Sequence, residues 1–293
     1  MQKQTFHRAE EIKKVIQLTP GRQLTLTRPL VMGVLNVTPD SFSDGGRYAT
    51  VDSAVEHALR MEQSGADIID IGGESTRPGA RPVEEEKEMK RVIPVIKRLR
   101  NLSDIPISID SYKARVAEAG LDAGADMVND ISALRFDTNM ALLIAQRRVP
   151  VVMMHMQGSP RDMQVDPHYE DCVTEIVVFF QRRIALCETQ GIDKSKIIID
   201  PGIGFGKRLS DNLQILNRFE EFSKLGVPVM VAASRKSFIG MLHDGDKPAD
   251  QRLGGSLSAA ILSVLKGAAI VRTHDVSETV EALKVLQAVR NSA

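Results

Sequence analysis

The sequence predicts an α/β fold, a single-domain (β/α)8 TIM barrel with a short N-terminal β-hairpin, and three observations lead to this prediction. Short apolar runs alternate with amphipathic segments eight times along the 293 residues, as expected for parallel strands with helices outside them. No glycine-rich dinucleotide fingerprint follows the first run, which disfavours an open, doubly wound sheet. No linker, low-complexity tract or internal repeat divides the chain.

Residues 1–29 are predicted to form an N-terminal extension with the hairpin, and residues 30–293 to form the barrel. Two short alternating runs, Val15 to Leu18 and Gln23 to Thr27, are joined through Pro20-Gly21, which is typical of a turn. We expect this hairpin to act as a plug or lid at one end of the barrel.

The eight strands of the barrel are predicted from short apolar runs that lie between turn signals. In chain order the runs are Val31 to Leu35, Asp67 to Ile71, Ile105 to Ile109, Asp126 to Asn129, Val149 to Met154, Lys196 to Ile199, Val227 to Ala232 and Ala268 to Val271.

Helical spacing is clearest in the first and last of the intervening segments. The first is predicted from Val51, Ala54, Val55 and Ala58. Thr50 is its candidate N-cap, and Gly65 is expected to end it. The last helix opens with Asp275 and Glu278 at capping-box spacing, which predicts that the Asp275 side chain caps it. Its apolar face is predicted from Val276, Val280, Leu283 and Leu286.

Composition excludes several classes of function. Lys plus Arg equals Asp plus Glu at 38 each, so no overall field favours nucleic acid or an anionic membrane. Trp is absent and aromatic residues make up 4% of the chain, which disfavours a stacking platform for single strands. The two cysteines, Cys172 and Cys187, fall in one predicted helix and do not make a disulfide framework. No apolar run reaches membrane-spanning length, so we expect a cytoplasmic protein.

Asp200 ends the run Ile197 to Ile199, which reads as a strand buried on both faces. A carboxylate at the end of a buried strand is costly unless donors reach it, and a ligand rich in N–H groups would supply them. A structural alternative is that Asp200 only caps the glycine turn that follows it. Because most other strands also end in polar residues, and parallel strands end on one face of a barrel, we predict a binding site there.

The polar residues at the strand ends sort into two chemistries. One set can accept from and donate to a flat heterocycle: Asp110, Asn129, Asp200 and Lys236. The other set suits a phosphate or diphosphate: Asn36, Thr76, Arg77, Arg272 and His274. Magnesium usually accompanies a diphosphate, and Asn36 can give it one oxygen.

Some polar residues near these strand ends have structural interpretations. Arg235 is expected to form an ion pair within its loop, and Asp130 and Asp275 to support their neighbours. His274 has the alternative role of capping the last helix. The roles of Lys207 and Ser234 stay open.

Five segments of the chain together resemble the dihydropteroate synthase family, in a match that runs from Leu30 to Leu286. The segments are Gly33 to Gly46, Asp70 to Gly79, Asp200 to Lys207, Ser234 to Gly240 and Arg272 to Asp275. Ala233 and Ile203 stand where Gly and Phe are common in the family, and neither position carries a role.

The resemblance implies a pterin-binding barrel that condenses 6-hydroxymethyl-7,8-dihydropterin diphosphate with p-aminobenzoate, giving 7,8-dihydropteroate and diphosphate for folate biosynthesis. The first set of residues would hold the pterin. Arg272, His274, Thr76 and Asn36 would hold the diphosphate, with Asn36 on Mg2+. The p-aminobenzoate pocket, for which sulfonamides compete, would be shaped by Ser237, Phe205, Pro78 and Phe42. A homodimer is also implied.

Three alternative functions stay open at this point. A pterin-barrel methyltransferase that acts on methyltetrahydrofolate would not need the diphosphate set, so Arg77, Arg272 and His274 disfavour it. A phosphate-binding aldolase or isomerase would use Lys236 as its catalytic lysine. A non-enzymatic pterin-binding protein is the alternative from another class.

Overall fold

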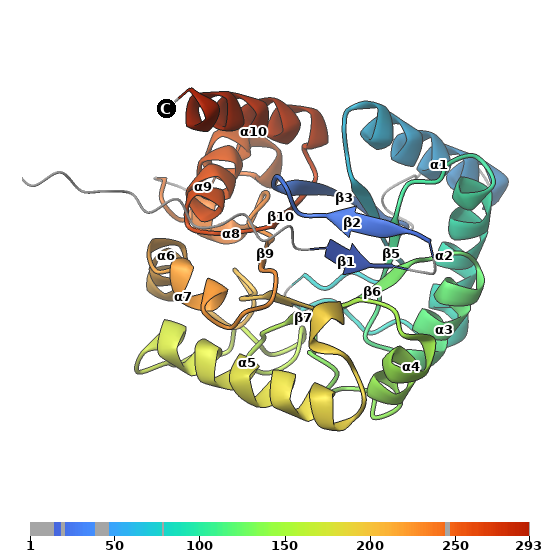
Figure 1. Ribbon diagram of the computed structural model, residues 1–293, viewed down its shortest axis with the longest axis horizontal. Helices are drawn as coiled ribbons and strands as arrows, with labels where there is room; N and C mark the ends of the chain where they lie inside the picture. The colour runs from blue at the N-terminus through green and yellow to red at the C-terminus, as the bar shows by residue number, and fades with distance from the viewer. Residues whose placement is uncertain (1–14, 19–20, 39–46, 78, 244–246, 293) are drawn as a thin grey trace, which may run out of the picture.

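Eight parallel strands form a barrel that helices surround (Figure 1), in a computed structural model that describes residues 15–18, 21–38, 47–77, 79–243 and 247–292. The strands are β3 (Leu30–Asn36), β4 (Ile68–Gly72), β5 (Ile107–Asp110), β6 (Met127–Asp130), β7 (Val151–Met154), β8 (Ile197–Asp200), β9 (Met230–Val231) and β10 (Ile270–Thr273). They pair in the order β8-β7-β6-β5-β4-β3-β10-β9. A parallel bridge between Ile199 and Val229 joins β8 to the start of β9 and nearly completes the circle. The predicted fold class is confirmed.

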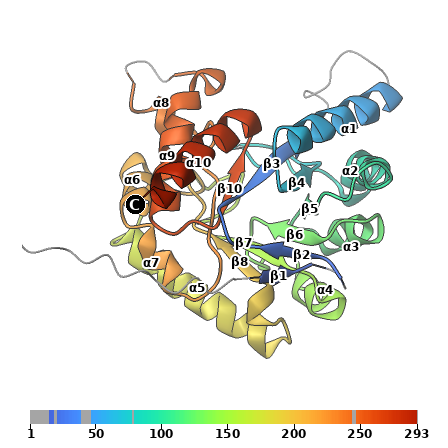
Figure 2. The same cartoon turned by 45° about the horizontal axis from the view of Figure 1, so that its top comes forward.

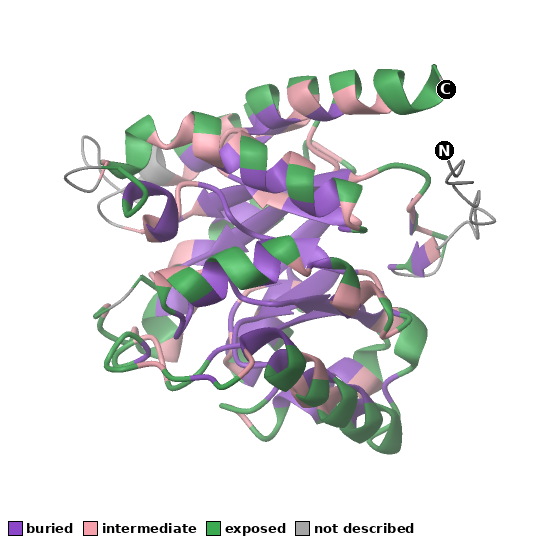
Figure 3. Ribbon diagram, turned by 90° about the vertical axis from the view of Figure 1, so that its left-hand side faces the viewer, coloured by how far each residue is buried: buried purple, intermediate pink, exposed green. Residues whose placement is uncertain are grey.

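The helices lie outside the ring of strands, with their exposed faces turned away from it (Figure 3). They are α1 (Arg47–Gln63), α2 (Glu85–Arg100), α3 (Ala114–Asp122), α4 (Met140–Arg147), α5 (Cys172–Thr189), α6 (Leu209–Asn217), α7 (Glu220–Ser223), α8 (Ser237–Gly240), α9 (Leu253–Leu265) and α10 (Val276–Asn291). In the described part of the chain, no helix is long and apolar enough to cross a membrane.

Two predicted helix starts differ from the structure. Helix α1 begins at Arg47, so Thr50 lies in its first turn and is not its N-cap. Asp275 occupies the N-cap position of α10, but its side chain makes no capping hydrogen bond, because its carboxylate pairs with Arg235. The predicted end of α1 is confirmed, since Gly65 follows it with a φ of 98° that glycine adopts without strain.

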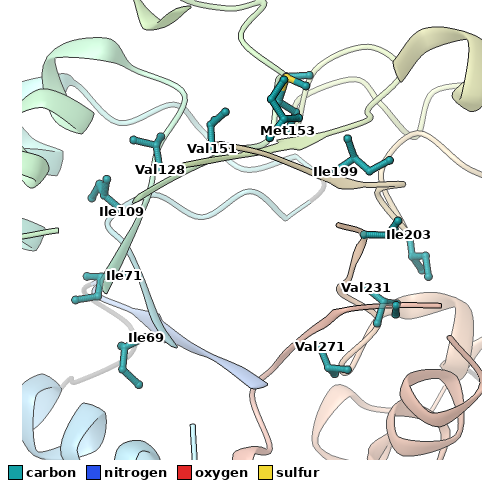
Figure 4. Packing of buried hydrophobic residues seen from close by; sticks show 14 of the residues in the cluster. Ile69, Ile71, Ile109, Val128, Val151, Met153, Ile199, Ile203, Val231 and Val271 are labelled. Atoms are coloured by element: carbon teal, nitrogen blue, oxygen red, sulfur yellow. The ribbon is translucent and has the colours of Figure 1, made fainter. Parts of the chain in front are cut away.

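The apolar residues of the strands form two separate cores because alternate side chains point to opposite faces of a strand. Outward-pointing residues such as Ile71, Ile109 and Val128 pack against the helices (Figure 4). Inward-pointing residues form a smaller cluster inside the barrel, and it includes Ile68 and Ile198.

The N-terminal hairpin closes one end of the inner core, as predicted. Strands β1 (Val15–Gln17) and β2 (Gln23–Thr25) pair antiparallel, and Ile16, Leu18 and Leu24 belong to the cluster inside the barrel. In Figure 2 the hairpin and α8 lie toward opposite ends of the barrel. The described hairpin therefore covers the inner core at the end where the strands begin.

The hairpin should contribute to stability through this plug. Ile16 is 1% exposed. Replacing it by Ala is expected to lower the free energy of unfolding by about 2–5 kcal/mol, because the side-chain carbons that are removed leave a cavity. Denaturant unfolding measures the change. The control Val165→Ala changes a side chain that is 78% exposed and should stay within roughly 0.5 kcal/mol of the wild type. Equal losses in both variants would contradict the plug.

Candidate functional site

The inward face of the barrel changes from apolar to polar near the carboxyl ends of the strands. In each strand, the last inward apolar residue and the first inward polar residue are two positions apart, so their side chains lie on the same face. The lower residues of these pairs belong to the inner apolar cluster, and the upper residues are polar: Ile68 and Asp70 on β4, Met127 and Asn129 on β6, Ile198 and Asp200 on β8, and Ile270 and Arg272 on β10. A polar layer therefore lies on top of the apolar one, at the open end of the barrel.

Arg272 ties this polar layer together. Its Nε donates to Oδ2 of Asp70 at 2.6 Å, and its Nη2 donates to Oδ2 of Asp110 at 2.7 Å. Asn129 donates through Nδ2 to the same oxygen of Asp70 at 3.0 Å. Four strands thus bring their residues into one network. Two of the guanidinium donors are held by carboxylates, so Arg272 stands between the two predicted sets and not in the diphosphate set alone.

Asp70 was not predicted as a site residue, although it is fully buried at the centre of this network. Ile68-Ile69-Asp70 repeats the pattern Ile198-Ile199-Asp200, in which an inward apolar residue is followed two positions later by an inward carboxylate. This similarity was the available signal. In the sequence, the motif that begins at Asp70 was instead interpreted through Thr76 and Arg77 of the loop that follows the strand.

Negative charges exceed positive ones in the polar layer, since Asp70, Asp110 and Asp200 face Arg272 and Lys236. Burial raises the pKa of Asp110 to about 7, and the Asp70 carboxylate adds to this more than Arg272 offsets it. Burial would lower the pKa of Arg272, but Asp70 and Asp110 together raise it above its ordinary value. The guanidinium stays charged, and Asp110 can accept a proton near neutral pH.

Two buried polar atoms in this layer have no partner among the described residues: Oδ1 of Asp70 and Oγ of Ser108. The two residues are neighbours across β4 and β5. Buried polar groups are nearly always hydrogen-bonded, so an unpaired acceptor beside an unpaired hydroxyl marks a place for a polar ligand atom or a water molecule.

Asp200 and Lys236 form the other side of the layer. Oδ1 of Asp200 accepts from the N–H of Gly202 at 2.7 Å, so it caps the glycine turn with one oxygen and leaves Oδ2 for another donor. Burial raises the pKa of Asp200. Burial also lowers the pKa of Lys236 to about 8, which Asp200 opposes. The Lys236 ammonium lies 3.9 Å from the ring centre of Phe205, a cation-π contact.

His274 is held by Ser234 and does not cap α10 through its ring. Nδ1 of His274 lies 3.1 Å from Oγ of Ser234, and the His274 N–H donates to the same oxygen at 3.1 Å. Because that oxygen already accepts the N–H, its own hydrogen is best placed on Nδ1, which puts the ring proton on Nε2. Burial, followed by Arg272, lowers the pKa of His274 to about 4, so the ring is neutral at pH 7.

The expected supporting residues are confirmed, with one change of partner. Asp130 is fully buried, and its oxygens accept from the N–H groups of Ser132 at 2.7 Å and Leu134 at 2.9 Å. Arg235 was predicted to pair within its own loop, but it pairs with Asp275 of the loop after β10. The pair joins the ends of β9 and β10.

The remaining predicted residues lie around the same mouth or outside the described residues. Asn36 is the last residue of β3, beside Gly72 of β4. Thr76 is half-buried and Arg77 exposed, on the loop after β4. Ser237 begins α8. Phe42 and Pro78 fall outside the described residues.

Glu74 anchors the start of the loop that carries Thr76 and Arg77, and the sequence did not indicate this role. It accepts from the hydroxyl of Tyr112 at 2.8 Å and from the N–H of Val83 at 3.2 Å, and it forms an ion pair with Lys113. Two loops at the open end are thereby joined.

Comparisons with known proteins agree with this geometry. The model of the family "Pterin binding enzyme" matches residues 32–274. The dihydropteroate synthase of Haemophilus influenzae is 46% identical over 92% of this chain and 97% of its own length. The Xanthomonas albilineans dihydropteroate synthase with 4-aminobenzoic acid superposes with a TM-score of 0.88 at 50% identity, covering 94% of this chain and 98% of that one. The Yersinia pestis dihydropteroate synthase with a sulfonamide drug complex has a TM-score of 0.88 at 45% identity, covering 94% and 99%.

Asp70 should control the protonation of Asp110. Asp70→Asn removes the negative charge that raises the Asp110 pKa and leaves Arg272 with one carboxylate, so Asp110 should titrate well below pH 7. Carbon-13 NMR of the side-chain carboxyl follows this titration.

The same change should appear in stability. A carboxyl whose pKa is raised on folding makes the free energy of unfolding fall as pH rises from about 4 to about 7, and this fall should shrink in Asp70→Asn. Asp52→Asn, at an exposed side chain on α1, is the control. An unchanged Asp110 titration in Asp70→Asn would refute the coupling.

Proposed function

The chain belongs to the family of pterin-binding enzymes, with the dihydropteroate synthases as its relatives, and we propose that it condenses 6-hydroxymethyl-7,8-dihydropterin diphosphate with p-aminobenzoate. The products are 7,8-dihydropteroate and diphosphate, which makes the protein a transferase of folate biosynthesis. The observation that carries the proposal is the polar layer in which Arg272 joins Asp70 and Asp110 above an apolar floor.

The pterin binds in the polar layer. Its ring N–H and amino groups donate to carboxylates, for which Oδ2 of Asp200 and the unpaired Oδ1 of Asp70 are placed. Asn129 offers an amide that accepts and donates, and Lys236 donates to a carbonyl or ring nitrogen. Asp110 completes the slot from β5.

The diphosphate lies farther out, at the rim. The tautomer that Ser234 favours turns the Nε2–H of His274 into a donor for a phosphate oxygen. Nη1 of Arg272 is the guanidinium nitrogen not bound to Asp70 or Asp110, and it serves the same group. Thr76 and Arg77 add a hydroxyl and a second fork from the loop after β4.

The reaction is a dissociative substitution at the exocyclic CH2 of the pterin. The electron-rich dihydropterin delocalises positive charge as the C–O bond breaks, so no protein nucleophile is needed. Ionised Asp110, with its pKa near 7, stabilises the cationic ring, and Arg272 and His274 stabilise the departing diphosphate. A neutral arylamine, held in line, then forms the C–N bond and afterwards loses its proton.

The p-aminobenzoate occupies a pocket beside Phe205 and Ser237, and the family resemblance assigns to the same pocket Phe42 and Pro78, which lie outside the described residues. Phe205 contributes an apolar wall with Met154, Met156, Met163 and Ile131. Sulfonamides resemble p-aminobenzoate in shape, and they compete for this pocket.

Asn36, at the end of β3, would give one amide oxygen to a magnesium ion that accompanies the diphosphate. No group of three or more His, Cys, Asp or Glu suited to a metal is found in the described ranges. This sparse donor set fits a hard ion that keeps most of its waters and takes its other oxygens from the diphosphate. When bound, magnesium would supply positive charge to the departing oxygens.

The enzyme works as a cytoplasmic homodimer. Leu262 and Leu265 of α9 and Val285 and Val289 of α10 are between 39% and 63% exposed, and these two helices lie side by side (Figure 1). An apolar face of this kind suits a symmetric contact with a second copy of the chain. The buried, unpaired Cys172 and Cys187 are compatible with a reducing compartment.

Purified protein incubated with the pterin diphosphate, magnesium and p-aminobenzoate should release diphosphate and form dihydropteroate. Slow release of diphosphate without the arylamine would favour the dissociative route. Pterin binding with no product would favour a non-enzymatic pterin-binding protein, and methyl transfer from methyltetrahydrofolate would favour the methyltransferase.

Arg272→Ala should slow the chemical step by roughly 100-fold or more, because a donor to the developing charge is removed. It should also weaken pterin binding, because Asp70 and Asp110 lose their cation, but by a smaller factor. Single-turnover rates and calorimetric binding of the pterin separate the two. Arg235→Ala, which changes a neighbouring arginine bound to Asp275, is the control for lost charge and packing. Equal losses in rate and affinity would contradict the assignment.

Asn36→Ala should raise the magnesium concentration needed for half-maximal activity by roughly 10-fold, since one ligand oxygen is lost. Calorimetric titration of magnesium into the protein with diphosphate gives a readout apart from turnover, and chelation with EDTA should abolish the difference. Asn139→Ala, at the start of α4, is the control. An unchanged magnesium affinity in Asn36→Ala would exclude Asn36 as a ligand.

A further inference from the structure

Lys207 carries a buried ammonium that the reaction does not use. The residue is 3% exposed, and its Nζ lies 3.0 Å from the carbonyl oxygen of Phe205, 3.3 Å from that of His155 and 3.1 Å from Nδ1 of His155. Three acceptors match the three hydrogens of the ammonium. Burying a charged side chain costs free energy, and here hydrogen bonds to all three acceptors offset that cost.

Lys207 joins two loops at the mouth of the barrel. Phe205 belongs to the loop 201–207 after β8, and His155 follows β7 directly. The N–H of His155 donates to the carbonyl of Asp200 at 2.9 Å. Gly202 lies so close that a Cβ there would stand 2.0 Å from the His155 carbonyl oxygen, so only glycine fits. The two loops are therefore fixed to each other at both ends of loop 201–207.

Other contacts of this loop hold Phe205 at its N–H, which donates to the Gly202 carbonyl at 3.1 Å, and hold the carbonyls of its two neighbours. Gln164 donates to the carbonyl of Gly204 at 2.8 Å, and the Tyr169 hydroxyl donates to that of Gly206 at 2.7 Å. Among the side chains that the structure describes, Lys207 is the one that donates to the Phe205 carbonyl. The carbonyl side of Phe205 is thus held by this ammonium.

A role for Lys207 as a general base is the competing interpretation, because burial lowers its pKa to about 7. Geometry disfavours it. In the ammonium form of Lys207 all three hydrogens have acceptors within the protein at 3.0 to 3.3 Å. One acceptor is Nδ1 of His155, whose pKa burial and Lys207 hold well below its ordinary value. The arylamine substrate would find no free lone pair on Lys207.

We propose that Lys207, together with His155, is a positioning residue for the arylamine pocket. It fixes the Phe205 carbonyl, and so holds the Phe205 ring against the Lys236 ammonium at 3.9 Å, where the ring forms one wall of the p-aminobenzoate site. The inference rests on the proposed function. It assigns Lys207 to the recognition of the second substrate and not to the pterin or the diphosphate.

The central variant is Lys207→Met, which keeps the length of the side chain and removes its donors. The KM for p-aminobenzoate should rise about 10-fold, as expected for loss of hydrogen bonds from a charged group, while the KM for the pterin diphosphate stays within about 2-fold. Lys224→Met changes an exposed lysine that directly follows α7 and should leave both constants unchanged.

A second pair of variants remains usable if Lys207→Met does not fold. His155→Leu removes the ring acceptor and should raise the KM for p-aminobenzoate, whereas His155→Asn presents an oxygen near the position of Nδ1 and should restore it. If His155 had a purely structural role, both variants would lose stability, and their KM values for p-aminobenzoate would not differ.

A double-mutant cycle tests whether Lys207 acts through Phe205. In a Phe205→Ala background, Lys207→Met should add less than about 2-fold to the KM for p-aminobenzoate, because the ring it positions is gone. Independent, multiplying effects would overturn the proposal, as would equal rises in both KM values or an unchanged KM in Lys207→Met. Product formation by the wild type is measured in the same assay, so failure of the proposed function is recognised separately.

Discussion

The ion pairs of Arg272 with Asp70 and Asp110 are the interaction on which the rest of the site depends. A guanidinium inside a barrel loses its hydration, and only well-placed carboxylates can offset that cost. The planar fork meets one carboxylate through Nε and another through Nη2. Because Asp70 also receives Asn129, one arginine holds the inward tips of β4, β5, β6 and β10 in a single arrangement before any substrate arrives.

The surplus of carboxylates in this layer gives the site its chemistry. Two cations face three carboxylates, so the buried layer retains a negative charge or binds a proton, and Asp110 does this near neutral pH. Such a slot suits a ligand that brings N–H groups and develops positive charge. The apolar floor, sealed from the other end by the hairpin, keeps water from competing for these carboxylates from below.

The loops around the mouth are held by buried polar contacts that are separate from the reacting groups. Glu74 and Lys113 fix the loop after β4, Arg235 and Asp275 join the ends of β9 and β10, and Lys207 fixes the loop after β8 to the one after β7. Each contact links neighbouring loops, so the polar layer is supported from outside.

The sequence by itself determined the alternation of strands and helices and the residue types at the strand ends, because both follow from local periodicity and from the cost of a polar tip on a buried strand. Asp110, Asn129, Asp200 and Lys236 were found in this way. Only the tertiary structure decided which partners these residues take. Asp70 belongs to the site because Arg272, 202 positions away in the chain, reaches it, and Asp275 pairs with Arg235 and leaves the helix end uncapped. Nothing in the local pattern distinguishes a carboxylate that caps from one that pairs, since that choice depends on which cation the closed barrel brings within reach.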